Sequence, residues 1–348
     1  MPENLYRRGG VWWARIQVSG HEVRKSLHTE RLDEARRRLK RVIHDSSHRR
    51  FHGEARHTWK ATVGRWALEH QSSVKPSTAK RYLCSLRQVA SELEPLYLDE
   101  VTRRCIADLV AVRKRAGARN ATIRRDLTAV SVVISASVSW GWREDNPAKE
   151  WDRGAIKERR DPIILPRESD IDFVVGLAPG NFAKMIRLAQ FSGMREEEAA
   201  SLERPEVNLT RRAADLSKTK TNRPRSVPLD DRAVGTLVGT PTHLKSQWVF
   251  WHGEAGDRYM NIASRFAELT RRAAKLALKE GRIFRRFTFH QLRHWFAVDY
   301  LRRGGSIYDL QQILGHTSIK TTELYLAFLT PDEAQKSKRA SAQNPAQV

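Results

Sequence analysis

The second half of the chain contains the motif His290-Gln291-Leu292-Arg293-His294. Three further segments in the second half of the chain accompany it: Phe191-Ser192-Gly193-Met194-Arg195-Glu196-Glu197-Glu198; Lys218-Thr219-Lys220 followed by Arg225-Ser226-Val227-Pro228-Leu229; and Leu314-Gly315-His316 with Tyr325 nine residues beyond the histidine. Any one of these segments alone is a weak signal. Together they set arginines, a lysine, histidines and a tyrosine in a fixed order, and this order carries the interpretation.

In that order and spacing the segments resemble the catalytic set of the tyrosine recombinase (phage integrase) family, in which Arg, Lys, His-x-x-Arg, His or Trp, and Tyr follow one another. The resemblance covers the catalytic half of the chain, and the layout of the first half fits it too. It implies a mainly α-helical multidomain protein with small β-sheets. One departure is Gln291, which stands where the common form of the family has Asp, at a position that usually supports rather than reacts.

The resemblance assigns Tyr325 as the nucleophile, which would form a 3′-phosphotyrosyl link and free a 5′-hydroxyl. Bond energy is then kept, and no ATP or other cofactor is expected. Attack on a phosphodiester puts extra negative charge on the non-bridging oxygens, and guanidinium groups suit them because they donate in a planar fork and stay charged. Arg195 and Arg293 are therefore the expected stabilising pair. His290 and His316 are expected to donate to the same phosphate or to help manage the proton of the nucleophile.

By the same resemblance, Lys220 is the general acid for the leaving 5′-oxygen. In the family this lysine lies on a β-hairpin, eight residues before the proline of a Val-Pro-Leu strand, and Lys220 and Pro228 have that spacing. Lys218 remains the alternative. A neighbouring cationic cluster lowers the pKa of a lysine and eases its proton release. Glu198, three residues after Arg195, resembles the carboxylate that holds this arginine in place in the family.

Two groups of histidines raise the question of a metal site. His290 and His294 are four residues apart, but an arginine and no glutamate base lies between them, which disfavours zinc. His44, His48 and His52 share a face of a predicted helix without a paired cysteine or carboxylate pattern. We therefore predict no metal site.

Charge indicates the class of partner. The 348 residues carry 63 Lys and Arg against 40 Asp and Glu, a formal net charge of +23. This excess favours a nucleic acid, because Lys and Arg displace counterions from phosphate backbones, with a generally basic surface or an anionic membrane as the alternatives. Two cysteines, no signal-peptide pattern and no apolar run long enough for a bilayer predict a soluble cytoplasmic protein. The resemblance implies that it acts on bacterial host DNA.

Periodicity and composition divide the chain into segments. Alternation over 11–18 predicts a strand, followed by a second strand and a basic helix over 32–52. The helical pattern that follows ends at Asn146-Pro147, because the residue before proline disfavours helix. With the roles that the resemblance implies, the predicted segments are 1–55, an N-terminal arm-type DNA-binding domain with a three-stranded sheet and a helix; 56–150, a helical core-binding domain; 151–166, an exposed linker; 167–330, a mixed α/β catalytic domain; and 331–348, a mobile C-terminal tail.

Several basic residues of the first half are candidates for DNA contacts, because a sheet with outward arginines can enter a major groove and basic helices can line a duplex. The alternative for the N-terminal module is a structural hairpin with a solvated basic helix. The candidates are Arg15, Arg24, Lys80, Arg81, Arg124 and Arg125.

The resemblance implies a site-specific integrase that works as a tetramer. Two DNA duplexes would exchange strands in pairs through a Holliday junction, at core-type and arm-type attachment sites of a mobile element that it integrates and also excises. A host DNA-bending protein and an excision directionality factor are candidate partners, and residues around Tyr325 and after Leu329 are candidates for docking on a neighbouring protomer. The alternatives are a DNA-binding regulator without recombinase activity and a type IB topoisomerase-like enzyme; the intact residue set argues against the first, and the separate N-terminal module against the second.

Overall fold

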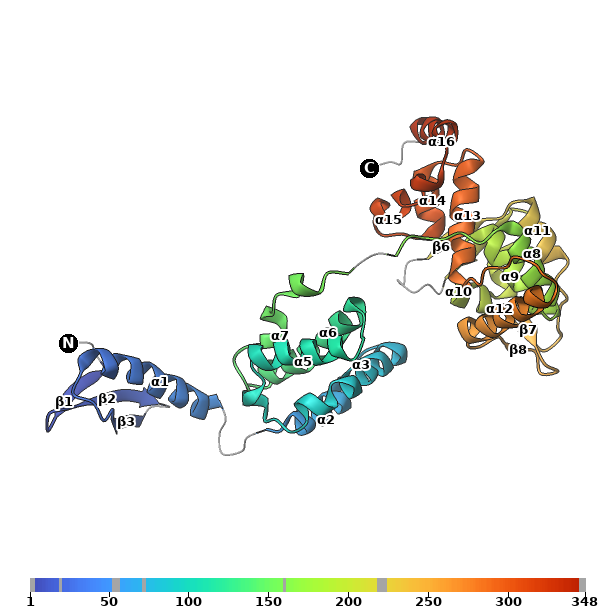
Figure 1. Cartoon of the computed structure of the whole chain (residues 1–348). Helices are drawn as coiled ribbons and strands as arrows, with labels where there is room; N and C mark the ends of the chain where they lie inside the picture. Colours follow the sequence, from blue (N-terminus) through green and yellow to red (C-terminus); the bar gives the residue numbers. More distant parts are fainter. Residues whose placement is uncertain are drawn as a thin grey trace. The chain divides into compact units, whose positions relative to one another are not determined.

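The computed structural model describes residues 4–18, 21–51, 57–70, 73–158, 161–217 and 224–343. The chain forms two compact units, Met1–Asp161 and Pro162–Val348. In the described residues, helices predominate and the strands form three small antiparallel sheets (Figure 1). This confirms the predicted fold class, mainly α-helical with small sheets.

A sheet and one helix make up the N-terminal part, with the bounds β1 Leu5–Arg8, β2 Val11–Val18, β3 His21–Ser26 and α1 Leu32–Phe51. The strand order is β1-β2-β3. Gly9 and Gly10 make the tight turn between β1 and β2, with φ of 58° and 81°. Ala14 and Ile16 of β2 are buried under α1, as the predicted alternation requires.

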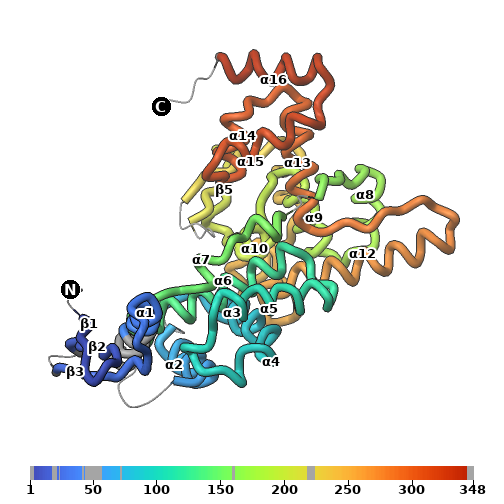
Figure 2. The backbone as a smooth tube through the Cα atoms, turned by 60° about the vertical axis from the view of Figure 1, so that its left-hand side comes forward, coloured from blue at the N-terminus to red at the C-terminus, as the bar shows by residue number. Residues whose placement is uncertain are grey.

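The rest of the first unit is helical, with the bounds α2 Trp59–His70, α3 Pro76–Gln88, α4 Ala90–Leu93, η1 Leu98–Glu100, α5 Arg103–Arg115, α6 Asn120–Ser139, α7 Pro147–Glu150 and η2 Arg153–Ile156. Helices α2, α3 and α5 pack against α6 (Figure 2). Ile123, Leu127 and Ile134 of α6 are fully buried at helical spacing, so α6 forms the centre of this core. The Thr58 hydroxyl accepts a hydrogen bond from the N–H of Ala61 at 3.2 Å, which caps the start of α2.

The end of α6 differs from the prediction. The helix ends at Ser139, and Gly141 follows it with φ of 74°, the left-handed conformation that commonly terminates a helix. Asn146 and Pro147 instead begin α7: the Asn146 side chain accepts a hydrogen bond from the N–H of Lys149, and the proline occupies the first turn. An Asn-Pro pair supplies an N-cap and a first-turn proline, so it starts a helix here rather than ending one.

The first residues of the predicted linker also differ from the expectation of an exposed segment. They form η2, and Ile156 is fully buried in the core around α6. Two side chains of the helical core donate hydrogen bonds to the backbone of this segment. Lys114 donates to the carbonyl of Ala155 at 3.2 Å, and Asn120 donates to that of Lys157 at 2.9 Å. The apolar anchor and these hydrogen bonds attach 153–157 to the helical core.

The second unit contains a three-stranded sheet of order β4-β5-β6, a two-stranded sheet and a set of helices. Helix α13 packs against α9, α14 and α16, so it lies at the centre of this unit. The bounds are α8 Glu168–Leu177, α9 Gly180–Ser192, α10 Glu196–Ala200, η3 Arg204–Glu206, β4 Val207–Asn208, β5 Ala213–Leu216, β6 Arg225–Pro228, α11 Asp231–Val238, β7 Trp251–His252, β8 Asp257–Arg258, α12 Ile262–Lys279, α13 His290–Arg302, α14 Ile307–Leu314, α15 Ile319–Glu323, η4 Leu326–Phe328 and α16 Pro331–Gln343.

The predicted tail contains an ordered helix, which corrects the expectation of a mobile segment from residue 331. Helix α16 packs on α13 and α14 of the same chain. Ser337 is buried and its hydroxyl donates to the carbonyl of Gly305 at 2.9 Å, while the hydroxyl of Ser341 accepts a hydrogen bond from the N–H of Ile307 at 3.3 Å. Small polar residues let the helix approach closely, so a composition that suggested a tail serves helix packing.

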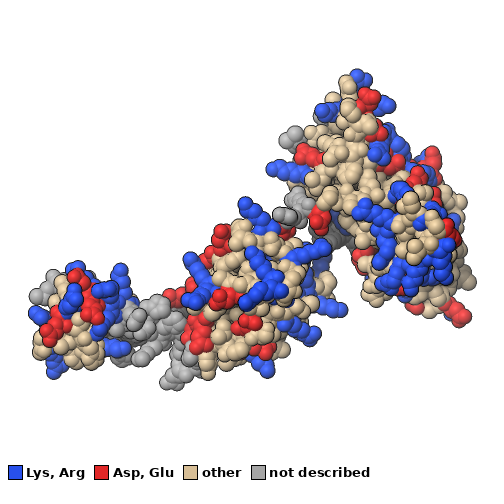
Figure 3. All heavy atoms as spheres, viewed as in Figure 1, with Lys and Arg blue, Asp and Glu red and all other residues tan. Residues whose placement is uncertain are grey.

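Basic side chains are prominent on the visible faces of both units (Figure 3). Within the described ranges, no helix is both long and apolar enough to cross a membrane. The same residues contain no group of three or more His, Cys, Asp or Glu that could hold a metal ion.

Replacing Ile156 by Ala tests whether η2 belongs to the helical core. We expect Ile156→Ala to lower the free energy of unfolding by about 2–5 kcal/mol, because it leaves a cavity against α6. The matched control is Ile164→Ala, since the Ile164 side chain is exposed and its loss should change stability by less than about 0.5 kcal/mol. Urea denaturation followed by tryptophan fluorescence measures both; equal effects would contradict the packing of η2.

Candidate active site

Helix α13 brings Arg293 into the interior of the second unit. Leu292, Phe296 and Ala297 anchor the helix in the core, and Arg293 on the same helix is only 2% exposed. Its guanidinium donates to the carbonyl of Gly193 at 2.7 Å and also to the carbonyl of Leu314. Two backbone acceptors from distant parts of the chain therefore fix the direction of this side chain.

Gly193 allows the close approach that this contact needs. It follows α9 with φ of 66°, and a Cβ on it would lie 2.4 Å from a ring carbon of Phe296. Such a distance is impossible for a real side chain, so only glycine fits between α9 and α13. The turn at Gly193 leads directly to Arg195, which precedes α10.

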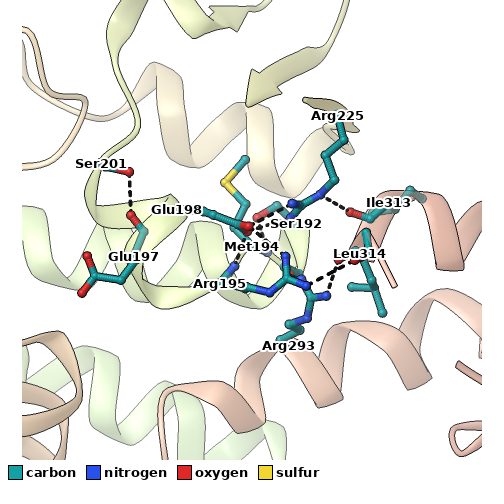
Figure 4. A network of polar contacts seen from close by, with 12 residues as sticks. Ser192, Met194, Arg195, Glu197, Glu198, Ser201, Arg225, Arg293, Ile313 and Leu314 are labelled. Atoms are coloured by element: carbon teal, nitrogen blue, oxygen red, sulfur yellow. Dashed lines mark hydrogen bonds and ion pairs between the residues drawn. The ribbon is translucent and has the colours of Figure 1, made fainter. Parts of the chain in front are cut away.

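A buried carboxylate joins two arginines beside Arg293 (Figure 4). Glu198 is 4% exposed, and its Oε1 accepts a hydrogen bond from Nη1 of Arg195 at 2.9 Å. Its Oε2 accepts the N–H of Arg195 at 2.8 Å, so the acid holds both the backbone and the side chain of that residue. Arg225 on β6 donates to both carboxylate oxygens, at 2.9 and 2.7 Å. Glu198 thus makes the contact with Arg195 that the resemblance implied, and it makes a second, bidentate contact with Arg225.

The end of α14 accepts hydrogen bonds from the same arginines. Arg225 donates from Nε to the carbonyl of Ile313 at 2.9 Å, Arg293 donates to that of Leu314, and Arg195 donates to that of Gly315 at 3.4 Å. Carbonyls at the C-terminus of a helix lack partners within the helix and carry partial negative charge. Three successive carbonyls therefore receive three guanidinium groups.

The charges in this cluster shift one another. Burial by itself would raise the pKa of the Glu198 carboxyl, but the hydrogen bonds and charge of Arg225, followed by those of Arg195, lower that pKa to about 2. Burial, together with the charges of Arg195 and Arg225, lowers the pKa of Arg293 to about 9. At neutral pH three cations thus face one carboxylate, and this positive excess suits an anionic ligand such as a phosphate.

Tyr325 lies in the same unit, after α15, with its side chain only 3% exposed. Its phenolic oxygen is 2.9 Å from Nδ1 of His294, a hydrogen-bond distance. Its ring stacks at 19° to the ring of His316, with the centroids 6.4 Å apart. Burial raises the pKa of the Tyr325 phenol, while the charge of Arg293 opposes that shift, so the phenol keeps its proton at neutral pH.

The two histidines beside Tyr325 are neutral at pH 7. Burial is the largest cause, and the charge of Arg293 adds to it; the pKa of His294 and that of His316 are both lowered to about 4. Nδ1 of His316 is 3.0 Å from the hydroxyl of Thr322, which is fully buried, so the ring is held from the side of α15. His290 is exposed at the start of α13, with its ring centroid 4.8 Å from that of His294.

The structure brings most of the predicted site residues into one unit. Arg195, Arg293, His316 and Tyr325 meet through the contacts above, and His290 lies beside them through the ring of His294. The structure does not describe Lys220 or its alternative Lys218. It also does not describe His52 or the side chains of His44 and His48.

Gln291 supports the site through the backbone. Its Oε1 accepts the N–H of Thr288 at 2.7 Å, which caps the start of α13, and its Nε2 donates to the carbonyl of Ile164 at 2.5 Å. An amide can accept at one end and donate at the other, whereas a carboxylate can only accept. Gln291 therefore links the segment before α8, at Ile164, to the helix that carries Arg293.

The candidate DNA contacts of the first unit have different environments. Arg15 and Arg24 pair across β2 and β3, and both donate to Glu22. Arg124 donates to the carbonyl of Arg153 at 3.1 Å, a contact that supports the fold locally. The remaining candidates have exposed side chains: Lys80, Arg81 and Arg125.

Two site residues were not identified from the sequence. In the sequence Arg225 is part of the strand that follows Lys220, and only its contact with the buried Glu198 singles it out. His294 was considered only as a zinc ligand. Its position directly after Arg293 was the available signal, since it places a second polar side chain on α13 next to the cluster.

Comparisons with known proteins indicate the family of the chain. The model of the Phage integrase family matches residues 180–330. The integrase of Escherichia phage P2 is 30% identical over 233 residues, which cover 66% of this chain and 62% of that protein. The tyrosine recombinase XerD of Caulobacter vibrioides is 31% identical over 227 residues, which cover 60% of this chain and 71% of that protein.

Solved structures share the fold. A lambda integrase dimer bound to a COC′ core site aligns with a TM-score of 0.66 at 19% identity, over 93% of this chain and 95% of that one. The Tn1549 transposon integrase with a circular intermediate DNA aligns with a TM-score of 0.63 at 17% identity, over 82% and 99%. The fold and the matches define a class of DNA breaking-and-rejoining enzymes. The chain belongs to the tyrosine recombinase (phage integrase) family.

Replacing Glu198 by Gln tests the charge balance of the cluster. We expect Glu198→Gln to lower the free energy of unfolding at pH 7 by about 3–5 kcal/mol, because two partly buried arginines lose their buried counter-charge while the side-chain shape is kept. The folded-state pKa of about 2 lies below the ordinary 4.5, so this stabilisation is complete above pH 4.5 and is lost as the pH falls toward 2. The gap between wild type and variant should therefore narrow over that window.

Chemical denaturation at several pH values measures this gap. The matched control is Glu197→Gln, whose side chain is 65% exposed and lies 3.7 Å from Arg258. That variant should lose less than about 1 kcal/mol at pH 7. A gap for Glu198→Gln that stays constant from pH 7 to pH 3 would contradict the assignment of the buried charge.

Proposed function

We propose that this chain is a site-specific integrase that joins a mobile element to bacterial DNA through a covalent bond to Tyr325. The observation that carries the proposal is the buried phenol of Tyr325, 2.9 Å from a neutral imidazole and in the same unit as a cluster of three arginines around one carboxylate. A nucleophile next to fixed cations is the arrangement that phosphodiester cleavage requires. The match to the integrase of phage P2 supports the link to a mobile element.

In this proposal Tyr325 attacks the phosphorus, forms the 3′-phosphotyrosyl link and releases the 5′-oxygen. Arg195 and Arg293 stabilise the charge that develops on the non-bridging oxygens. His290 and His316 donate to the same phosphate or take part in the proton transfer from the nucleophile. Lys220 protonates the leaving 5′-oxygen. The later attack of a 5′-hydroxyl on the phosphotyrosine reseals the strand, so the reaction needs neither ATP nor a metal.

Glu198 and Arg225 have positioning roles in the same scheme. Glu198 fixes the guanidinium of Arg195 before the substrate arrives, and Arg225 holds Glu198 in turn. Donors that are oriented in advance cost no reorganisation during the reaction, which is the main source of their catalytic effect.

The first unit supplies DNA recognition in this proposal. The sheet and helix of 1–55 bind arm-type sites, and the helices of 56–150 bind the core site on the face opposite the catalytic domain of 167–330. Arg15, Arg24, Lys80, Arg81, Arg124 and Arg125 are the proposed DNA contacts. The chain would act as a tetramer on two duplexes through a Holliday junction; lambda integrase, which shares the fold, has been crystallised as a tetramer bound to a Holliday junction.

The proposed setting is DNA in the bacterial cytoplasm, together with a host DNA-bending protein and an excision directionality factor. The net charge of +23 suits the polyanionic partner, and the two unpaired cysteines suit a reducing compartment.

A nicked DNA substrate tests the reaction. The full chain is incubated in EDTA with a nicked duplex that carries a site selected by binding from random-sequence DNA, and covalent complexes are separated on a denaturing gel. We expect a protein–DNA band from wild type and none from Tyr325→Phe, because the nick traps the covalent link by letting the leaving strand dissociate. Specific binding by wild type without a band would move the protein to the regulators. A band that persists in Tyr325→Phe would place the nucleophile elsewhere.

A further inference from the structure

His294 lies in the site, but the proposed reaction gives it no role. It follows Arg293 on α13 and is partly buried, with its ring centroid 5.7 Å from that of Tyr325. Consecutive helical residues point about 100° apart. While Arg293 reaches the carbonyls of Gly193 and Leu314, His294 therefore reaches a different group, the phenol of Tyr325.

The protonation states give this contact a direction. A neutral imidazole has one nitrogen that accepts and one that donates. Burial, then the neighbouring charges of His290 and Arg293, lowers the pKa of His294 to about 4, and burial raises the pKa of the phenol. The phenol thus keeps a proton to donate, and Nδ1 of His294 is available to accept it when the ring proton is on Nε2.

We propose that His294 is a positioning residue for Tyr325: its Nδ1 accepts a hydrogen bond from the phenolic O–H and holds the nucleophile at the arginine cluster. This inference rests on the proposed function, in which Tyr325 attacks the phosphate. A buried hydroxyl without a partner is unfavourable, so the phenol would turn toward another acceptor if Nδ1 were absent. Because His294 and Arg293 are neighbours on α13, this hydrogen bond couples the orientation of the Tyr325 phenol to that of the Arg293 guanidinium.

Two substitutions separate the acceptor from the imidazole ring. In His294→Asn, the amide Oδ1 occupies about the place of Nδ1 and can accept the same hydrogen bond, whereas His294→Ala removes the acceptor. We expect His294→Asn to cleave the nicked substrate within about fivefold of the wild-type rate and His294→Ala to be slower by about 100-fold, the loss typical of a misplaced reacting group. Saturating DNA confines the comparison to the cleavage step.

A small nucleophile distinguishes positioning from damage to the phosphate site. In the Tyr325→Phe background, hydrogen peroxide is supplied as the attacking group, and strand cleavage is measured with and without His294→Ala. We expect the same peroxide-driven rate in both proteins, because His294 acts only through Tyr325. Adding Arg293→Ala to Tyr325→Phe is the control, and it should abolish cleavage because the phosphate loses its fixed cation.

The outcomes are distinct. Wild-type cleavage with a slow His294→Ala, an active His294→Asn and unchanged peroxide cleavage supports the positioning role. A His294→Ala rate equal to wild type, a His294→Asn rate as low as that of His294→Ala, or loss of peroxide cleavage would each overturn it while leaving the proposed function intact. Absence of cleavage by the wild-type protein on DNA that it binds would overturn the proposed function and, with it, this inference.

Discussion

Three successive carbonyls at the end of α14 accept hydrogen bonds from three arginines that lie far apart in the sequence. Arg195 comes from the turn before α10, Arg225 from β6 and Arg293 from α13. Such like charges repel one another, and the helix C-terminus together with the Glu198 carboxylate makes their proximity tolerable. The turn before α10, β6 and α13 are thereby tied to the end of α14. His316, whose ring lies beside that of Tyr325, follows this helix end directly.

The negative charge around the three arginines does not balance their positive charge, and the proposed reaction depends on the positive charge that remains. One carboxylate and a set of carbonyl dipoles do not neutralise three guanidinium groups. Burial, and after it the charges of Arg195 and Arg225, lowers the pKa of Arg293 to about 9. A phosphate placed at the cluster would supply the missing negative charge. In the proposed reaction, DNA binding would relieve this electrostatic cost, and donors already held by backbone carbonyls would need little rearrangement.

The sequence predicted much of the local structure and the identity of most of the cluster, but not the contacts that hold it together. Alternation in β2 and helical spacing in α6 are properties of neighbouring residues, so they could be predicted directly. The role of Arg225 depends on a partner 27 residues earlier in the chain, and that of His294 on one 31 residues later. Spacing carries no information on such pairs. The helix after Thr330 is a different case, because the reciprocal hydrogen bonds between Thr330 and Glu333 are a capping box that the sequence displays and that polar composition obscured.

Helix α13 connects the two chemical requirements of the site, a fixed cation and an oriented nucleophile. The core packing of α13 sets its rotation and hence where Arg293 and His294 point, and the carbonyls of Gly193 and Leu314 fix the guanidinium of Arg293. Gly193 is required for that approach, since a Cβ there would overlap the ring of Phe296. A change at the α9–α13 contact would therefore move Arg293, the proposed phosphate ligand, and His294, the partner of Tyr325, together. Cleavage in this protein should accordingly be sensitive to the packing of α9 against α13, because the orientation of α13 places both groups.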